Sequence, residues 1–327
     1  MQTSLDVLIV GGGLVGLSLA AALAEMFPAR CIGLVEAQLP PASAPTWDER
    51  CIALNDGSRQ VLARFGLWAG VMPQTAPILS THISERGRFG QVRFSAQDAG
   101  LPALGYNTPL RALGDVLLAR VRRQVNVQLL TPVTLTALRP SATQVEVELR
   151  SPDGATRMLC AGLLLAADGA QSTVRSLLGL QAHRRDYAQS ALVTAVRAQR
   201  DPAGVAYERF TPDGPFALLP KPRLPDDPQT GHPCSLIWTL PPEQAAAKAA
   251  LPDADFLNAA AECFGERVGR FLAVGRRIQY PLTQSLHDHQ PVARTVFCGN
   301  AAQALHPVAA QGFNLALRDV AGLLDWL

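Results

Sequence analysis

The sequence predicts an α/β fold of two interleaved domains, one built on a buried parallel sheet and the other rich in antiparallel strands. Three short apolar runs of the kind found in buried strands each end in a glycine-containing turn, at residues 7–10, 163–166 and 295–298. A block from Ala191 to Leu240 instead alternates short β-type segments with turns. The length of 327 residues fits about two domains.

The first run opens a complete nucleotide-binding unit. A strand, a glycine-rich turn, a helix and a second strand follow one another at residues 7–10, 11–16, 17–26 and 31–35. Gly11, Gly13 and Gly16 have G-x-G-x-x-G spacing, in which one glycine makes the tight turn, one admits a pyrophosphate and one packs the helix on the strand. Glu36 follows the second strand, where an acid binds the ribose hydroxyls. The pattern predicts a Rossmann-like dinucleotide site with phosphates at the helix N-terminus.

Composition excludes several classes of protein. Hydrophobic residues make up 48% and charged residues 17%, with a net charge of +2 and no long basic run, so nothing indicates nucleic-acid binding. The six cysteines are scattered without a C-x-x-C pair, which favours reduced thiols in the cytoplasm. No uninterrupted apolar window reaches about 18 residues, so we expect a soluble chain or one that rests on a membrane.

The remaining elements follow from local patterns. We expect helices at 55–65, 113–121 and 243–274 and a C-terminal helix that includes 320–327. We expect a hairpin at 78–94, a strand at 125–130, a small antiparallel meander at 133–138, 144–150 and 157–160, and a strand at 276–284. Residues 220–233, dense in Pro and Asp, predict an exposed, mobile loop.

The second apolar run ends in Asp168 and Gly169, and Arg175 follows at helical spacing. Polar groups at the carboxyl end of a parallel strand lie where α/β folds bind ligands. An ordinary strand-to-helix turn with an aspartate N-cap is an equally good interpretation of this segment alone.

The third run ends in Gly299 and Asn300, and a loop of small residues leads through His306 and Pro307 to the final helix. Small side chains leave room for a flat ring to rest on this loop. The helix N-terminus near Gly312 and Asn314 can stabilise negative charge on such a ring, as a reduced flavin carries.

Together the three motifs resemble the flavin-dependent aromatic hydroxylases of the p-hydroxybenzoate hydroxylase type, and specifically the 2-polyprenyl-6-methoxyphenol hydroxylases of the ubiquinone-biosynthesis branch. Four segments carry this resemblance: G-N-A-A-Q-A-L-H-P-V-A-A-Q-G-F-N-L at 299–315, Y-E-R-F-T-P-D-G-P-F-A-L-L-P at 207–220, W-D-E-R-C-I-A-L at 47–54 and G-L-P-A-L-G-Y at 100–106. Asn300 stands where the wider superfamily has aspartate, and Ala310 and Ala316 where the family usually has glycine.

The resemblance implies FAD as cofactor and NAD(P)H and O2 as co-substrates, with a flavin C4a-hydroperoxide as the oxygen donor to a polyprenyl-phenol. No metal is implied; His287 and His289 have H-x-H spacing, but a third ligand is not evident. The residues then expected to hold FAD are Gly11, Gly13, Gly16, Glu36, Arg50, Arg111, Asp168, Gly169, Arg175, Gly299, Asn300, Pro307, Gln311, Gly312 and Asn314. NAD(P)H is expected to dock transiently near Asp168 and Arg175.

On the substrate side, Tyr207, Phe216, Leu218 and Trp238 are expected on the sheet face towards the flavin, with ordinary core packing as the alternative for each. His306 is expected to orient the phenol, with a purely structural histidine as the alternative. Solvated surface arginines are the alternative for Arg50 and Arg111.

The resemblance also implies the domain division and the partners. We expect a discontinuous FAD-binding domain at 1–75, 105–180 and 281–327, a β-rich substrate domain at 76–104 and 181–280, and further C-terminal helices beyond residue 327. We expect a cytoplasmic protein with a peripheral membrane contact, within a ubiquinone-biosynthesis complex or as a homo-oligomer.

Three other functions stay open at this point. The chain could hydroxylate another phenol or ring position, act as a non-catalytic flavoprotein of a ubiquinone-biosynthesis complex, or be an NAD-dependent dehydrogenase that uses the N-terminal unit alone. The dehydrogenase would leave the second and third motifs without a role.

Overall fold

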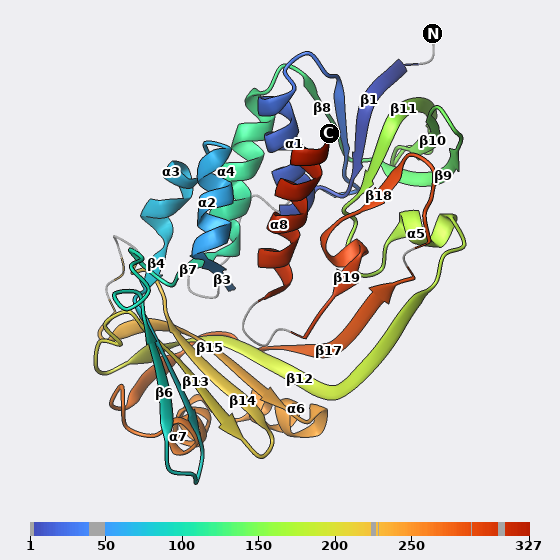
Figure 1. Cartoon of the computed structure of the whole chain (residues 1–327). Coiled ribbons are helices and arrows are strands. Elements are labelled where there is room, and N and C mark those ends of the chain that lie inside the picture. Colours follow the sequence, from blue (N-terminus) through green and yellow to red (C-terminus); the bar gives the residue numbers. More distant parts are fainter. Residues whose placement is uncertain (1–2, 39–49, 224–226, 228, 289, 307–310) are drawn as a thin grey trace.

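The computed structural model describes residues 3–38, 50–223, 227, 229–288, 290–306 and 311–327 (Figure 1). Among these residues the strands form three sheets, of seven, nine and three strands. The seven-stranded sheet and its helices make one half of the molecule and the nine-stranded sheet makes the other (Figure 1). The α/β class and the two-part architecture expected from the sequence are confirmed.

The seven-stranded sheet is centred on the first predicted strand. Its parallel strands are β8 (Val127–Leu130), β2 (Ile32–Val35), β1 (Thr3–Val10), β11 (Thr156–Ala166) and β18 (Thr295–Phe297). All three apolar runs are therefore neighbours: Val10 lies opposite Ala166, and Ala166 opposite Phe297. Their carboxyl ends, and the three glycine turns that follow, meet at one edge of the sheet.

The expected meander forms one side of this sheet. Its strands β9 (Thr134–Pro140) and β10 (Val145–Arg150) pair antiparallel, and β10 pairs with β11. Residues 157–160 and 163–166 belong to the single strand β11, because Gly162 between them lies against the carbonyl of Asp6 and lets the strand run on: a Cβ there would be 3.0 Å from that oxygen.

Helices cover one face of this sheet, where α1 (Leu14–Met26) packs between α4 (Leu110–Arg123) and α8 (Gln311–Trp326) (Figure 1). Short elements complete this half: α2 (Asp56–Arg64), α3 (Trp68–Val71), η1 (Met72–Gln74), α5 (Thr173–Leu177) and η2 (Gly299–Ala301). The three-stranded sheet consists of β3 (Cys51–Asn55), β7 (Gly105–Pro109) and β4 (Ala76–Ile78). Within the described residues, no helix is both long enough and apolar enough to cross a bilayer.

The nine-stranded sheet carries α6 (Pro242–Ala250) and α7 (Asp253–Phe264) on one face. Its main order is β19 (Gln303–Ala304), β17 (Ile278–His287), β12 (Ala182–Ala198), β15 (His232–Leu240), β14 (Gly214–Pro220), β13 (Val205–Thr211), β5 (Ser80–Glu85) and β6 (Gln91–Ser95). The expected domain boundary at residue 281 falls inside β17.

The helix expected over 243–274 ends early. Helix α7 stops at Phe264 because Gly265 adopts φ 88°, and β16 (Phe271–Val274) pairs with β12. The four apolar residues of this strand also fit a helical pattern, so their periodicity did not predict a strand.

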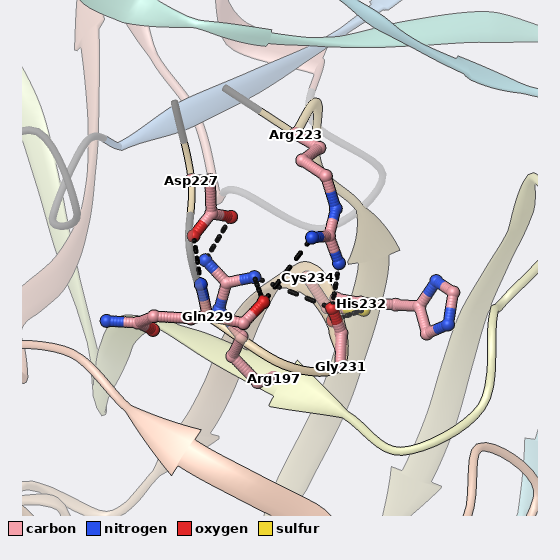
Figure 2. Close-up of polar contacts among 7 residues, drawn as sticks. All are labelled: Arg197, Arg223, Asp227, Gln229, Gly231, His232 and Cys234. Atoms are coloured by element: carbon pink, nitrogen blue, oxygen red, sulfur yellow. Dashed lines mark hydrogen bonds and ion pairs between the residues drawn. The ribbon is translucent and has the colours of Figure 1, made fainter. Parts of the chain in front are cut away.

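A buried ion pair fixes part of the loop that was expected to be exposed and mobile (Figure 2). The Arg197 side chain, on β12, is 2% exposed and donates to the carboxylate of Asp227, whose side chain is 9% exposed. Both Arg197 and Arg223 also donate to the carbonyls of Gln229 and Gly231. The expectation of an exposed loop is therefore wrong for Asp227, because a buried arginine needs an acidic partner.

Candidate functional site

The first glycine turn lets helix α1 approach strand β1 and its neighbour β11 closely. A Cβ at Gly16 would lie 1.8 Å from the carbonyl oxygen of Gly11, so only glycine fits there. Gly11 itself has φ 104° and faces the carbonyl of Ala167, which a Cβ would approach to 2.6 Å. Gly13 is the N-cap of α1, and a Cβ there would meet nothing within 4 Å. The helix N-terminus is thus open on the side where a phosphate would approach.

Glu36 lies directly beside this turn. The backbone N–H of Gly12 donates to its Oε2 atom at 2.5 Å, and a Cβ on Gly12 would be 2.8 Å from the Glu36 Cβ. Gly12 was not predicted as a site residue, because it is not one of the three glycines of the G-x-G-x-x-G spacing. The close approach places a carboxylate next to the helix N-terminus, as ribose recognition requires.

Asp168, in the second turn, has one carboxylate oxygen in use and one without a partner. Its Oδ2 atom accepts from the backbone N–H of Val174 at 3.0 Å. Its Oδ1 atom is buried and has no hydrogen-bond partner among the described residues. Ser172, not Asp168, is the N-cap of α5, since its Oγ accepts from the N–H of Arg175. A buried acceptor without a partner is costly, which indicates that a donor from outside the chain completes this site.

Arg175 connects the second turn to the third. The residue is 4% exposed, and its guanidinium donates to the carbonyl of Ala301 at 3.0 Å and to that of Ala170 at 2.5 Å. Both bonds point into the protein. This placement favours a structural role over the expected contact with NAD(P)H.

The third turn packs against the first. Gly299 has φ 57°, and a Cβ there would lie 2.9 Å from a methyl of Val15 in α1 and 3.4 Å from the Cβ of Ala316 in α8. The methyl of Ala316 therefore meets Gly299 from inside the protein. Asn300 is exposed beside it, whereas Pro307 and Ala310 lie outside the described residues. Burial raises the pKa of the neighbouring Cys298 thiol to about 12, so this sulfur is an inert packing group.

Asn314 secures the start of helix α8. Its side chain is buried, its Oδ1 accepts from the N–H of Asn55 at 3.0 Å and from Ser58 Oγ at 2.6 Å, and its amide donates to the carbonyl of Ala53 at 2.8 Å. The side chain thus holds α8 against β3 and α2. Gln311 and Gly312, one turn earlier, are half-buried.

A small pocket lies between the two halves of the molecule. Its lining consists of Arg50, Cys51, Val193, Thr194, Ala195, Ser235, Ile237 and Ile278. Arg50 lines this pocket, and its guanidinium stands over the Tyr280 ring, 5.4 Å from the ring centroid. Arg111, at the start of α4, forms an ion pair with Asp115 at 3.5 Å.

Four residues expected to face the flavin lie on the other side of the nine-stranded sheet. Phe216, Leu218 and Trp238 are buried in the core formed with α6 and α7, and Tyr207 packs against it. Side chains alternate along a strand, so these four face the helices while Val193 and Ile237 face the pocket. Core packing, the alternative interpretation, describes their positions.

His306 lies close to β12, at a bulge in that strand. Its ring is edge-on to Tyr187, with centroids 4.8 Å apart, and its Nε2 atom is 3.4 Å from Gln189 Oε1. Partial burial lowers the pKa of His306, so its imidazole is neutral near pH 7. In the part of the chain that the structure describes, no three His, Cys, Asp or Glu side chains gather as metal ligands.

Sequence comparisons agree on one group of proteins. The family described as "FAD binding domain" matches residues 4–327. The chain is 36% identical over 323 residues to the ubiquinone hydroxylase UbiL of Rhodospirillum rubrum, covering 98% of this chain and 72% of that protein. It is 32% identical to the 3-demethoxyubiquinol 3-hydroxylase of Escherichia coli, covering 98% of this chain and 79% of that protein.

Solved structures share the fold. The PqsL protein of P. aeruginosa, crystallised with 2-aminobenzoylacetate, superposes with a TM-score of 0.80 at 22% identity, over 99% of this chain and 86% of that one. The p-nitrophenol 4-monooxygenase PnpA of Pseudomonas putida gives a TM-score of 0.77 at 19% identity, over 99% and 80%. At these identities the likeness establishes the architecture alone.

Proposed function

Because the chain belongs to the FAD-dependent monooxygenase family of ubiquinone-biosynthesis hydroxylases, we propose that it hydroxylates the ring of a polyprenyl-phenol precursor of ubiquinone. The chain is an FAD-dependent aromatic hydroxylase with NAD(P)H as reductant. FAD, when bound, accepts a hydride and activates O2 for transfer of one oxygen atom to an electron-rich ring.

The convergence of the three turns carries the proposal. Gly11 and Gly16 close the first turn on the sheet, Arg175 joins the second to the third, and Gly299 brings the third back to α1. A dehydrogenase that uses only the first unit would not need this connection. The buried Asp168 Oδ1 without a partner and the open side of Gly13 both fit a bound dinucleotide.

We assign the parts of FAD by chemistry. The N–H groups at the start of α1 would bind the pyrophosphate, and Glu36 would accept from the adenosine ribose. Asp168 Oδ1 would accept a hydroxyl or N–H of the cofactor, and Asn300 has an amide suited to the ribityl hydroxyls. The N-terminus of α8, held by Asn314, would stabilise negative charge on the reduced ring.

We place the phenol ring on the surface around the small pocket between the two halves, since the pocket itself is about the size of one water molecule. Val193, Ile237 and Ile278 give it apolar walls, while Arg50 and Ser235 supply polar side chains that can orient a hydroxyl. We assign His306, which lies beside Tyr187 and Gln189 on β12, the role of a neutral hydrogen-bonding residue, because partial burial lowers its pKa. These groups orient the ring and exclude water, while the cofactor supplies the redox chemistry.

The polyprenyl tail of the proposed substrate also indicates where in the cell the protein acts. We propose that the chain acts at a membrane surface in the cytoplasm, alone or within a ubiquinone-biosynthesis complex or homo-oligomer. The family supports this, because a precursor with a polyprenyl tail partitions into the bilayer.

The deciding experiment combines flavin binding with turnover. We expect purified protein titrated with FAD to show the absorbance and quenched fluorescence of bound flavin. With NADPH, O2 and a prenylated methoxyphenol, we expect a product that carries one oxygen from isotopically labelled O2. A protein that binds FAD and oxidises NADPH without labelled product would contradict the proposed substrate. A protein that binds NAD but no flavin would contradict the proposed function altogether.

A further inference from the structure

The hairpin of β5 and β6 forms the edge of the nine-stranded sheet and projects away from the seven-stranded sheet (Figure 1). Its turn, residues 86–90, carries Phe89 in a fully exposed position. On the edge strand itself, Val92 is 51% and Phe94 is 54% exposed. Exposed edge strands are normally protected by charge, proline or a covering element, so large apolar side chains here need an explanation.

The apolar side chains share one face. Val92 lies opposite Ile83 and Phe94 opposite Thr81, and Phe210, on the next strand, lies opposite Glu85 in the same alternation. Phe210 is 42% exposed. Arg93 points to the other face, since it lies between Val92 and Phe94 on the strand. The hairpin is therefore amphipathic.

Positive charge is concentrated on the same hairpin. Residues 80–95 contain three arginines, Arg86, Arg88 and Arg93, and one acid, Glu85, which gives 3 − 1 = +2. The whole chain also has a net charge of +2, so the rest of the sequence sums to zero. All three arginines are exposed; Arg88 is paired with Glu85 at 2.9 Å. Arginines around exposed aromatic side chains match an anionic lipid surface.

We propose that the β5–β6 hairpin docks on an anionic lipid bilayer, with Phe89, Val92 and Phe94 in the interface and the arginines against lipid headgroups. A protein partner would also cover the apolar face, but the concentration of the net charge favours a surface of phosphate groups. This inference rests on the proposed function in one respect: the docking would deliver a substrate that is dissolved in the bilayer.

The apolar face of the hairpin continues to the pocket. One row of opposed residues crosses the sheet, through Val92, Ile83, Glu208, Ala217, Ile237, Val193 and Ile278. The last three line the pocket between the two halves. Glu208 is the one acid in this row, and burial raises its pKa. A polyprenyl tail can thus lie along this row, between the bilayer and the phenol site.

Vesicle co-sedimentation tests the docking without reference to catalysis. We expect the protein to bind vesicles of phosphatidylcholine with phosphatidylglycerol more tightly than vesicles of phosphatidylcholine alone. Replacing Arg86, Arg88 and Arg93 by glutamine should weaken binding to the anionic vesicles about fivefold per arginine. The variant Phe89→Ser should weaken it about tenfold, from the loss of buried apolar area.

Matched controls lie elsewhere on the surface. Val125→Ser replaces a fully exposed apolar residue outside the hairpin, and Arg122→Gln with Arg123→Gln removes two exposed charges from α4. These variants should bind as the wild type does. Equal binding by hairpin and control variants, or no preference for anionic vesicles, would overturn the proposal and favour a protein partner. Hydroxylation of a short, tail-free phenol should be unchanged in the hairpin variants. A wild-type protein that binds anionic vesicles but does not hydroxylate such a phenol would contradict the proposed function and leave the proposed docking intact.

Discussion

Arg175 donates from a buried position to the carbonyl oxygen of Ala301, 126 residues away, at 3.0 Å. This bond joins the second glycine turn to the third, and a further bond to Ala170 fixes the guanidinium within its own turn. The parts of the cofactor site that come from distant segments are therefore held together by the protein itself.

Replacing Arg175 should loosen this connection. Arg175→Ala leaves two buried carbonyls without a charged donor, at about 1.5–3 kcal/mol each. We expect a lower free energy of unfolding in urea and weaker FAD binding by fluorescence titration. Arg184→Ala, at an exposed arginine nearby, is the control and should change neither quantity. Wild-type FAD affinity in Arg175→Ala would show that the connection does not shape the site.

Two glycines in helices should respond in opposite ways to the same substitution. Gly16→Ala places a Cβ where the Gly11 carbonyl already lies, 1.8 Å away, so α1 must shift from β1 and FAD binding should be lost. Gly322→Ala, in α8, meets nothing within 4 Å and should stabilise the helix by about 0.5–1 kcal/mol. Thermal unfolding and FAD titration of both variants check this. Equal effects of the two would contradict the packing argument.

Glu36 should contribute mainly to cofactor affinity. Glu36→Ala removes the proposed acceptor of the ribose hydroxyls, and a hydrogen bond to a charged group contributes about 1.5–3 kcal/mol, or roughly ten- to a hundredfold in the dissociation constant for FAD. Glu262→Ala, at an exposed acid on α7, should leave that constant unchanged. A Glu36→Ala protein that binds FAD as tightly as the wild type does would contradict the assignment.

Local patterns in the sequence were enough to predict the three turns, because glycines that permit close approach have a fixed spacing. They were not enough to predict the contacts of Arg175 or Asn314, whose partners lie 126 and up to 261 residues away. The sequence also did not predict which face of a strand meets the pocket. Alternation places Phe216 and Trp238 on one face and Ile237 on the other, but it does not assign either face to the pocket. Both kinds of error reflect tertiary packing.

The ion pair of Arg197 and Asp227 was likewise not predictable from local sequence patterns. The pair predicts how the stability of the protein depends on pH. Burial raises the pKa of Asp227, but hydrogen bonds from Arg197 and from the Gln229 N–H outweigh this, so its pKa lies below the usual value. A depressed carboxyl pKa stabilises the folded state above the unfolded value of about 3.9, and this contribution is lost as pH falls through the lower folded value. Asp227→Asn should therefore cost about 3 kcal/mol at neutral pH and less in acid, because it removes the carboxylate that faces the buried charge of Arg197. Urea unfolding between about pH 3 and pH 7 measures this difference, with Asp98→Asn, at an exposed aspartate, as the control. A penalty for Asp227→Asn that stays constant down to pH 3 would show that ionisation of this carboxyl does not stabilise the fold.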